Sequence, residues 1–299
     1  MWAKRIEKIF MQLLGVILSI AFLFPIYVLA INSFKPLRDI YKNAINFPET
    51  WSVENYIKAF DRLNFFNSFT NSLKITGLTV VIIIFISSLA AWALVRYKTR
   101  ASNVIFMIFA SAMLIPFQCV MLPLIRNMGQ LHLLNTPGLI FMYQGFGCSM
   151  AIILFHGFIK NIPLELEEAA TIDGCGMFRR FFCIVLPLLK PIIVTVAILN
   201  VMSTWNDYLL PSLVINKEGI QTLPLKTFLF FGQFAKKWDL ATAGLVLCMI
   251  PIIIFYLCCQ KYIVKGVTEG AVKGYKYECE KSVVEKKCGI PDLSKKFYG

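Results

Sequence analysis

The 299-residue chain is too apolar and too poor in charge to fold as a soluble domain, since 58% of its residues are apolar and 16% are charged, whereas soluble domains carry about a quarter charged residues. Its net charge of +13 would suit a nucleic-acid binder, but the basic residues lie at the ends of long apolar runs, which is where positive charge orients a membrane protein. The composition therefore argues against nucleic acid as a partner and predicts an all-α, polytopic protein in a lipid bilayer.

Six apolar runs are long enough to cross a bilayer, which takes roughly 20 residues each. The first run could be a cleaved signal peptide, but it is longer than the apolar core of one and no small-residue cleavage site ends it. We therefore predict six transmembrane helices within one domain, residues 1–274. They cover residues 9–34, 75–95, 101–125, 138–159, 188–213 and 240–260.

The basic residues predict which side of the membrane each connection occupies. The short connection after the second run carries Arg96, Lys98 and Arg100, and short connections rich in Lys and Arg stay in the cytoplasm. With that connection inside, both termini are predicted to be cytoplasmic. Residues 275–299 are rich in lysine and glutamate without apolar periodicity, which predicts a cytoplasmic tail.

Two of the predicted outer connections are long enough to contain structure. In residues 35–71, Ser52 is suited to cap a short amphipathic helix that ends near Phe60. Residues 214–240 interleave phenylalanines with lysines, which is typical of an interfacial or re-entrant piece rather than an open loop.

The inner connection between the fourth and fifth runs is the most informative stretch. A helix is predicted over Pro163–Asp173, with Asn161 or Ile162 in the cap region and Pro163 presetting φ at its start. Gly174 then permits the left-handed residue that ends a helix. The residues thus predict a short, well-terminated helix in this connection.

The remaining residues of this connection suggest two interpretations. Its first turns are acidic, where the helix dipole favours negative charge; the acidic residues are Glu165, Glu167 and Glu168. A second helical piece is predicted from about Met177 to Phe182. The apolar side chains of the first helix either meet a partner protein or pack against the bundle; these are Leu166, Ala169, Ala170 and Ile172. From the residues alone, a docking element and a simple helical hairpin are equally acceptable.

A family resemblance bears on this choice. The series Glu168-Ala169-Ala170, Gly174, Ile184-x-Leu186-Pro187 resembles the EAA signature of ABC importer permeases. Over about residues 1–274 the chain is similar to the second permease subunit of the maltose-type carbohydrate uptake family. The other matching motifs are Asn32-Ser33-Phe34-Lys35, Pro48-x-x-Trp51-Ser52-x-Glu54-Asn55-Tyr56, Asn71-Ser72, Ala90-Ala91-Trp92-Ala93-Leu94-x-Arg96-Tyr97, Leu133-Leu134-Asn135-Thr136, Trp205-Asn206-Asp207, Leu223-Pro224 and Gly270-Ala271-Val272-Lys273-Gly274.

The resemblance implies a fold and a set of partners. The fold would be the type I ABC importer permease (MetI-like) fold, in the bacterial inner (cytoplasmic) membrane. This chain and a second, homologous permease subunit would form the path for a carbohydrate, expected to be an oligosaccharide. Two cytoplasmic ATP-binding subunits, which hold ATP and Mg, would grip the coupling helices at 163–182, and an extracytoplasmic solute-binding protein would deliver the solute. The chain itself would be no enzyme and hold no cofactor, because it contains no GxxxxGK(S/T) phosphate loop.

The resemblance also implies which residues meet the ATPase subunits. They are Glu165, Glu168, Ala169, Ala170, Asp173, Gly174, Phe178, Leu186 and Pro187. Polar residues within the spans are candidates for lining the path or its gate; these are Gln118, Gln144, Trp205, Asn206 and Asp207. For Asp207, a structural role in an outer turn is favoured over contact with the solute. His132 and His156 lack a second ligand at metal-binding spacing, so no metal site is predicted.

Two other classes of protein explain the sequence less well. A secondary transporter or channel that works alone is expected to contain inverted repeats with paired broken helices, and the sequence suggests only one capped inner helix pair. A membrane enzyme needs a catalytic cluster at membrane depth, and two lone histidines do not provide one. The cargo stays less certain than the class, because glycerol-phosphate-type solutes use the same kind of permease.

Overall fold

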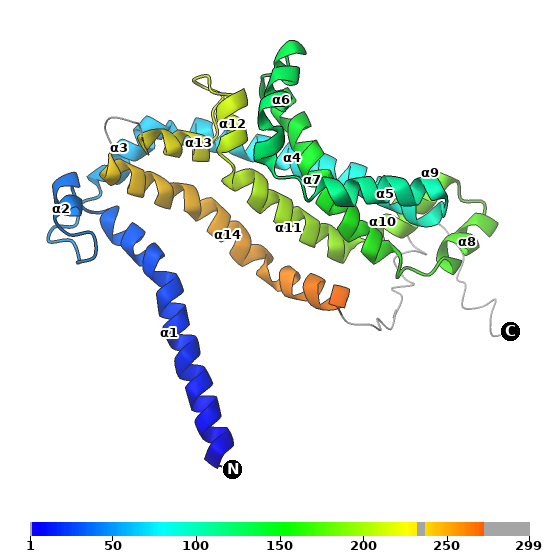
Figure 1. Cartoon of the computed structure of the whole chain (residues 1–299), viewed down its shortest axis with the longest axis horizontal. Helices are drawn as coiled ribbons and strands as arrows, with labels where there is room; N and C mark the ends of the chain where they lie inside the picture. Colours follow the sequence, from blue (N-terminus) through cyan, green and yellow to red (C-terminus); the bar gives the residue numbers. More distant parts are fainter. Residues whose placement is uncertain (1, 232–236, 272–299) are drawn as a thin grey trace. The chain divides into compact units, whose positions relative to one another are not determined.

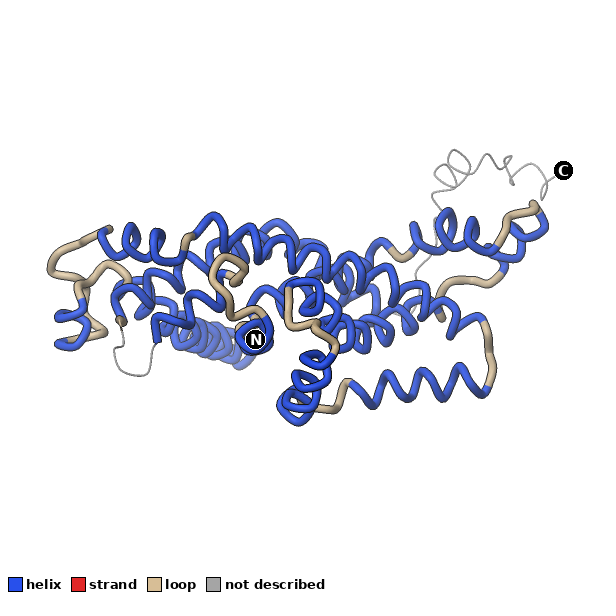
Figure 2. The backbone as a smooth tube through the Cα atoms, turned by 90° about the horizontal axis from the view of Figure 1, so that it is seen from above, coloured by secondary structure: helices blue, strands red, loops and turns tan. Residues whose placement is uncertain are grey.

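The computed structural model describes residues 2–231 and 237–271, and the chain divides into two compact units. Unit 1 comprises Met1–Leu73 and Asp207–Ile254, and unit 2 comprises Lys74–Asn206 and Phe255–Gly299. Every regular element of the described residues is helical, and Figure 2 shows helices joined by loops with no strand among them. The all-α prediction is thus confirmed, while the predicted tail, 275–299, lies outside the described residues.

Unit 1 begins with a long apolar helix that makes few contacts within the chain. Only 6% of the apolar window in α1 is buried, and Figure 1 shows α1 extending away from the other helices of its unit. Such a helix satisfies its own backbone hydrogen bonds, which suits a lipid environment. The elements of unit 1 are α1 (Trp2–Asn32), α2 (Leu37–Lys42), α3 (Glu54–Leu63), the start of α4 (Phe65–Arg96), α12 (Leu209–Val214), α13 (Leu223–Phe228), the 3-10 helix η2 (Leu229–Phe231) and most of α14 (Trp238–Ala271).

The predicted amphipathic helix in the first outer connection is α3. The cap predicted at Ser52 is not formed: the N-cap position is held by Val53, which makes no side-chain cap hydrogen bond. The Ser52 hydroxyl instead accepts a hydrogen bond from the N–H of Glu54, the first helical residue, at 3.2 Å. The helix continues past Phe60 to Leu63, and Asn64 ends it with a left-handed φ of 44°. Asn tolerates that conformation better than most residues, which explains why the helix ends there rather than at Phe60.

The second outer connection is tied to the start of α4. The amides of Asn67 and Asn71 both donate to the carbonyl oxygen of Gly219 at 2.8 Å. Next to them, the Ser72 hydroxyl accepts from the backbone N–H of Leu223 at 2.8 Å. This part of the 214–240 segment is therefore an ordered piece held by polar contacts, and its residues 232–236 lie outside the described residues.

Unit 2 is built around the packing of α4, α7 and α11. Its core includes fully buried Ala151 and Phe155 of α7, Phe181 of the π-helix and Val196 of α11. Gly147 lets these helices approach closely, because a Cβ there would lie 2.2 Å from the Cδ1 atom of Ile83. The elements of unit 2 are the rest of α4, α5 (Arg100–Ala112), α6 (Phe117–Gln130), α7 (Thr136–Ile159), α8 (Glu165–Ile172), α9 (Met177–Arg180), the π-helix η1 (Phe181–Val185), α10 (Leu186–Leu188), α11 (Lys190–Asn206) and the end of α14.

Four helices in the described residues are long and apolar enough to cross a membrane, or up to six if each of two bent pairs counts as one span. The predicted third span, 101–125, is not one straight helix: α5 and α6 meet at 103°, and Figure 1 shows α6 turned away from α5. The reason is local, since Pro116 lacks the N–H that would continue α5 and restricts the residue before it.

The predicted fifth span, 188–213, is also divided. The helical run Met177–Leu188 bends by 76° into α11, and Pro191 at the start of α11 has no N–H to bond back across the bend. At its other end α11 stops at Asn206, and α12 begins at Leu209. The break at Asp207 is the one that the charged residue indicates in the sequence, and the bend before Pro191 is an additional one.

Candidate functional site

The segment between α7 and α11, residues 160–189, is called the connecting segment below. It is a run of short helices, in which α9 continues through η1 into α10 after a turn that follows α8. Its inward-facing side chains pack on unit 2 and hold the segment there, so it is not a free loop. One apolar group contains Ala170, Cys175 and Ile184 with Leu166, Cys183 and Leu188, and a second contains Ile162, Phe181, Val185 and Leu189.

The start of α8 differs from the prediction. The helix begins at Glu165 after Leu164, which makes no side-chain cap hydrogen bond, instead of beginning at Pro163 under a cap from Asn161. The amide of Asn161 donates backwards to the carbonyl oxygen of Gly157 at 3.3 Å, where the last carbonyls of α7 need donors. Asn161 thus belongs to the end of the preceding helix, and Pro163 precedes α8.

The end of α8 follows the prediction closely. Gly174 adopts a left-handed φ of +80°. Its N–H bonds to the carbonyl of Thr171 at 3.0 Å, and the N–H of Cys175 bonds to the carbonyl of Ala170 at 2.9 Å. These two bonds form the Schellman arrangement, which satisfies carbonyls at a helix end and is usually accompanied by an apolar contact such as that between Ala170 and Cys175.

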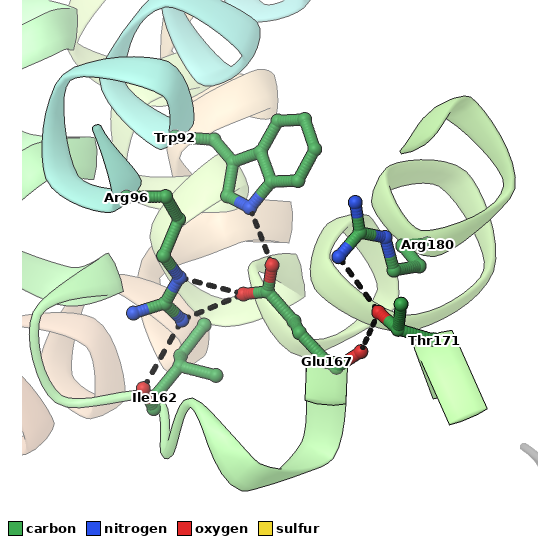
Figure 3. A network of polar contacts seen from close by, with 6 residues as sticks. All are labelled: Trp92, Arg96, Ile162, Glu167, Thr171 and Arg180. Carbon is green, nitrogen blue, oxygen red and sulfur yellow. Dashed lines mark hydrogen bonds and ion pairs between the residues drawn. The ribbon is translucent and has the colours of Figure 1, made fainter. Parts of the chain in front are cut away.

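A buried glutamate holds α8 to the end of α4 (Figure 3). The Glu167 side chain is only 3% exposed, and its Oε1 lies 2.7 Å from both Nε and Nη2 of Arg96. Its Oε2 accepts from the indole N–H of Trp92 at 2.9 Å. Arg96 also donates to the carbonyl of Ile162 at 3.2 Å, in the turn before α8. We call Glu167, Arg96 and Trp92 the α4–α8 clamp.

The clamp satisfies a charge that would otherwise be costly to bury. Both carboxylate oxygens of Glu167 have charged or strong donors, and hydrogen bonds to ionised groups are about twice as strong as neutral ones. Removing one partner of a buried pair costs about 3–5 kcal/mol, because the other charge is left uncompensated. The clamp therefore fixes the position of α8 on unit 2.

A second polar contact joins α8 to α9 across the turn. The Thr171 hydroxyl donates to the Glu167 carbonyl at 2.7 Å and accepts from Nη1 of Arg180 at 2.8 Å (Figure 3). Since Arg180 leads directly into η1, the two helical pieces of the connecting segment are linked to each other as well as to the core.

The surface of the connecting segment that points away from unit 2 is called the outward face. Six of the nine residues predicted to contact a partner are exposed on it: Glu165, Glu168, Asp173, Gly174, Phe178 and Pro187. Ala169 and Leu186 are half-buried, and Ala170 is instead buried inside unit 2, against Cys175 and Ile184. Two large apolar side chains stand out on this face, since Ile172 is 86% exposed and Phe178 is 71% exposed.

The structure also shows why Ala170 points inward. It lies three residues after Glu167, so both side chains project from the same side of α8. Once the clamp fixes Glu167 toward α4, Ala170 faces inward as well, where it packs against Cys175 and Ile184 of the connecting segment. The signature alanines therefore do not act alike: Ala170 packs within the connecting segment, and only its neighbour Ala169 is partly accessible.

Beside the clamp lies a pocket of about 290 Å³ between the end of α4 and the start of the connecting segment. Three basic side chains and one acidic side chain line it, namely Arg96, Lys98, Lys160 and Glu165. Arg96 is already bonded to Glu167, so the pocket is a part of the same region rather than a separate site.

The residues predicted to line the path lie on other elements than the connecting segment, namely α6, α7 and the end of α11 with the turn after it. Gln118 is exposed on α6, and Gln144 is half-buried on α7, where its amide donates to the carbonyls of Ile140 and Thr79 at 3.0 and 3.4 Å. The Asn206 amide donates within its own helix, to the carbonyl of Met202 at 2.9 Å.

The Trp205-Asn206-Asp207 group lies at the junction of α11 and α12. Trp205 is buried at the end of α11. Asp207 accepts hydrogen bonds from the N–H groups of Leu209 and Leu210 at 2.9 and 3.4 Å, which are the first residues of α12. A carboxylate in that position satisfies donors at a helix start, so Asp207 forms the turn between the two helices, and its part in the path stays a prediction.

The histidines have packing or turn positions. His156 stacks on Phe106 with ring centroids 3.9 Å apart, and His132 has a left-handed φ of 56° before α7. Within residues 2–231 and 237–271, no group of three His, Cys, Asp or Glu side chains is arranged to hold a metal ion.

The site residues predicted from the sequence do not include the clamp. Trp92 and Arg96 are four residues apart, so they share one side of α4. Two hydrogen-bond donors on one side of the end of an apolar helix indicate that an acceptor from another segment lies against them. What the sequence does not show is which of the three glutamates in α8 they meet, because local position suits all three equally well.

Comparison with known proteins places the chain among membrane transport components. The family model for the binding-protein-dependent transport system inner membrane component matches residues 83–269. The probable starch degradation products transport system permease protein of Thermoanaerobacterium thermosulfurigenes is 46% identical, over 90% of this chain and 98% of its own length. The melibiose/raffinose/stachyose import permease protein of Bacillus subtilis (strain 168) is 37% identical, over 88% of this chain and 95% of its own length.

A solved structure has the same fold. The crystal structure of a bacterial ABC transporter involved in import of the acidic polysaccharide alginate matches with a TM-score of 0.75 and 26% identity, over 87% of this chain and 97% of that chain. A second structure, the bacterial alginate ABC transporter in complex with its pentasaccharide-bound periplasmic protein, matches with a TM-score of 0.65 at 15% identity, which supports the fold alone.

Proposed function

We propose that this chain, which belongs to the family of binding-protein-dependent transport system inner membrane components, forms half of the path of an ATP-driven importer for an oligosaccharide. The observation that carries the proposal is the connecting segment, which is anchored to the core on one side and exposes apolar side chains on the other. The substrate class is supported by relatives that are named for starch products and for melibiose, raffinose and stachyose.

The importer needs partners that supply energy and solute. A second, homologous permease completes the path, and an extracytoplasmic solute-binding protein delivers the sugar. Two ATPase subunits, which bind ATP and Mg, dock on the outward face. Support for this division comes from the sequence, in which a phosphate-binding loop is absent, and from the exposure of Ile172 and Phe178.

The sidedness of the protein follows from its charges. The connecting segment and both termini lie in the cytoplasm of a bacterial cell, and the protein resides in the inner membrane. The positive-inside rule supports this orientation, since the connecting segment contains Lys160, Arg179 and Arg180.

Movement of the ATPase subunits reaches the membrane through the connecting segment. Because α9, η1 and α10 follow one another without a gap and lead into α11, a displacement of the outward face is passed along the chain as a rigid-body change. A π-helix in this position is notable, since such bulges are frequent at functional sites.

The test is reconstitution of the permease pair in proteoliposomes with the ATPase subunits and the binding protein. We expect uptake of labelled maltodextrin or raffinose-type sugars that requires ATP and every partner. Uptake by this chain alone without ATP would show a stand-alone transporter or channel. Failure of the purified permease to retain an ATPase subunit would also contradict the proposal.

A matched pair of substitutions tests the docking face. Phe178→Ala removes an apolar side chain that is 71% exposed on the outward face, and Phe66→Ala removes one that is 72% exposed at the start of α4. We expect Phe178→Ala to reduce capture of the ATPase subunit during purification, and Phe66→Ala to leave that capture unchanged. Equal capture by the two variants would exclude Phe178 from the docking surface.

A further inference from the structure

We infer that Glu167 is a positioning residue that makes α8 and the end of α4 move as one body during transport. This inference rests on the proposed function, because it concerns how a force received by the connecting segment is distributed. The chain itself carries such a force along one route, from α8 through α9, η1 and α10 to α11. The α4–α8 clamp supplies a second route, to a helix that lies about seventy residues earlier in the chain.

The joints on either side of α8 are what make the clamp necessary. Residues 160–164 before α8 are not helical, and after α8 the chain passes through Gly174 with a left-handed φ of +80° and Gly176 in extended conformation. The backbone on either side of this eight-residue helix therefore does little to prevent α8 from tilting when a partner applies force to the outward face. Apolar packing of Ala170 resists sliding only weakly, because it is non-directional.

The clamp provides the direction that packing lacks. The planar guanidinium of Arg96 offers two nitrogens to the same carboxylate oxygen at 2.7 Å, while the Trp92 indole N–H binds the other oxygen at 2.9 Å. Trp92 and Arg96 are one turn apart on α4. Because they bind different oxygens of the Glu167 carboxylate, they fix both its position along α4 and its orientation. The third bond of Arg96, to the carbonyl of Ile162, ties the joint before α8 to the same point.

Trp92 also links the clamp to the start of the other route. Its ring packs on that of Phe181 with centroids 5.3 Å apart, and Phe181 is the first residue of η1. Trp92 of α4 therefore contacts both Glu167 of α8, through a hydrogen bond, and Phe181 of η1, through its ring. A displacement of α8 with the clamp closed must move α4 and η1 together.

The helix that receives this second route belongs to both compact units. Residues Phe65–Leu73 of α4 lie in unit 1 and Lys74–Arg96 lie in unit 2. Asn67 and Asn71 in the first part hold the 214–222 segment through the carbonyl of Gly219.

The experiment compares Glu167→Gln with Glu54→Gln in the complete reconstituted importer. The two substitutions are chemically identical, but Glu54 forms an exposed ion pair with Lys58 at 2.7 Å, outside the connecting segment. The quantity measured is sugar imported per ATP hydrolysed. We expect Glu167→Gln to lower this ratio about tenfold, which is the shift in a two-state equilibrium that follows loss of one charge-assisted hydrogen bond, with ATP hydrolysis retained. Glu54→Gln should leave the ratio unchanged.

A second variant and a second readout separate coupling from folding. Trp92→Phe keeps an aromatic ring against Phe181 but removes the hydrogen bond to Oε2 of Glu167 and leaves both Arg96 contacts to Oε1. Its import per ATP should therefore lie between the wild-type value and that of Glu167→Gln. Hydrogen exchange of residues 164–175 in the assembled complex should be faster in Glu167→Gln, while exchange in α7 is unchanged. Accelerated exchange throughout the chain would mean general unfolding and would overturn the inference.

The inference and the proposed function fail in different ways. If the wild-type complex does not import sugar at the expense of ATP, the proposed function is wrong. If the wild-type complex imports sugar and Glu167→Gln does so with an unchanged ratio, only the clamp's role in transmission is refuted.

Discussion

Gly174 is the position at which the local structure makes the sharpest demand on residue type. Its φ of +80° is left-handed, and a Cβ built there meets no atom within 4 Å. A substitution is therefore opposed by backbone strain alone, without a steric clash. Gly176, two residues away, has φ −64° and ψ 165°, which any residue adopts, and a Cβ there also meets nothing within 4 Å. The two glycines form a natural pair of test and control.

The expected cost of Gly174→Ala follows from the conformation. A residue with a Cβ is destabilised by about 1–2 kcal/mol in the left-handed conformation. This strain favours opening of the turn, which breaks the two hydrogen bonds that end α8, from the N–H groups of Gly174 and Cys175. Opening of this turn should become about five- to thirtyfold more frequent. Hydrogen exchange of a peptide that covers residues 170–176 measures this directly, and Gly174→Asn should show a smaller change because Asn tolerates left-handed φ.

The outcome can contradict this reasoning in two ways. If Gly176→Ala accelerates exchange as much as Gly174→Ala, the effect comes from adding any methyl group to the turn and not from φ. If Gly174→Asn is as harmful as Gly174→Ala, left-handed strain is not the cause. In the reconstituted importer, Gly174→Ala should also lower import per ATP, because a frayed α8 transmits force poorly.

Three further predictions concern other parts of the chain. Gly138→Ala should lower thermal stability by more than about 2 kcal/mol, since its Cβ would lie 1.8 Å from the backbone oxygen of Leu133; unchanged thermal unfolding would contradict the tight turn before α7. Gly147→Ala should lower the free energy of unfolding by about 1–3 kcal/mol, because its Cβ would lie 2.2 Å from Cδ1 of Ile83 and 2.7 Å from Oδ1 of Asn200; the same substitution should cost less when it is measured in an Ile83→Ala background. Burial lowers the pKa of Lys35 below 10.5, although the charge of Asp39 opposes this shift. As pH rises, the Lys35 ammonium group therefore loses its proton at a lower pH in the folded chain than in the unfolded chain. Stability should therefore rise as pH increases through the folded pKa toward 10.5, and Lys35→Met should remove that rise in thermal unfolding scans.

Local signals in the sequence account for much of the fold. Apolar runs predict membrane-spanning helices because lipid replaces water as the solvent and the backbone must bond internally. Gly174 ends α8 where the sequence indicates, since a left-handed residue depends on neighbours within four positions, whereas the N-cap of α3 is Val53 and not the predicted Ser52. The two bent spans also have local causes in Pro116 and Pro191, which composition averaged over a whole run does not reveal.

The direction of each side chain in the connecting segment was decided by the tertiary structure alone. Glu165, Glu167 and Glu168 have the same chemistry and nearly the same position in α8, and nothing local distinguishes them. Glu167 is buried because Trp92 and Arg96, more than seventy residues earlier, present two donors where its carboxylate lies. That contact in turn directs Ala170 inward and leaves Ile172 exposed. The sequence alone thus determined that a terminated helix stands between two spans, and only long-range contacts decided which face of it holds the protein together and which is left for a partner.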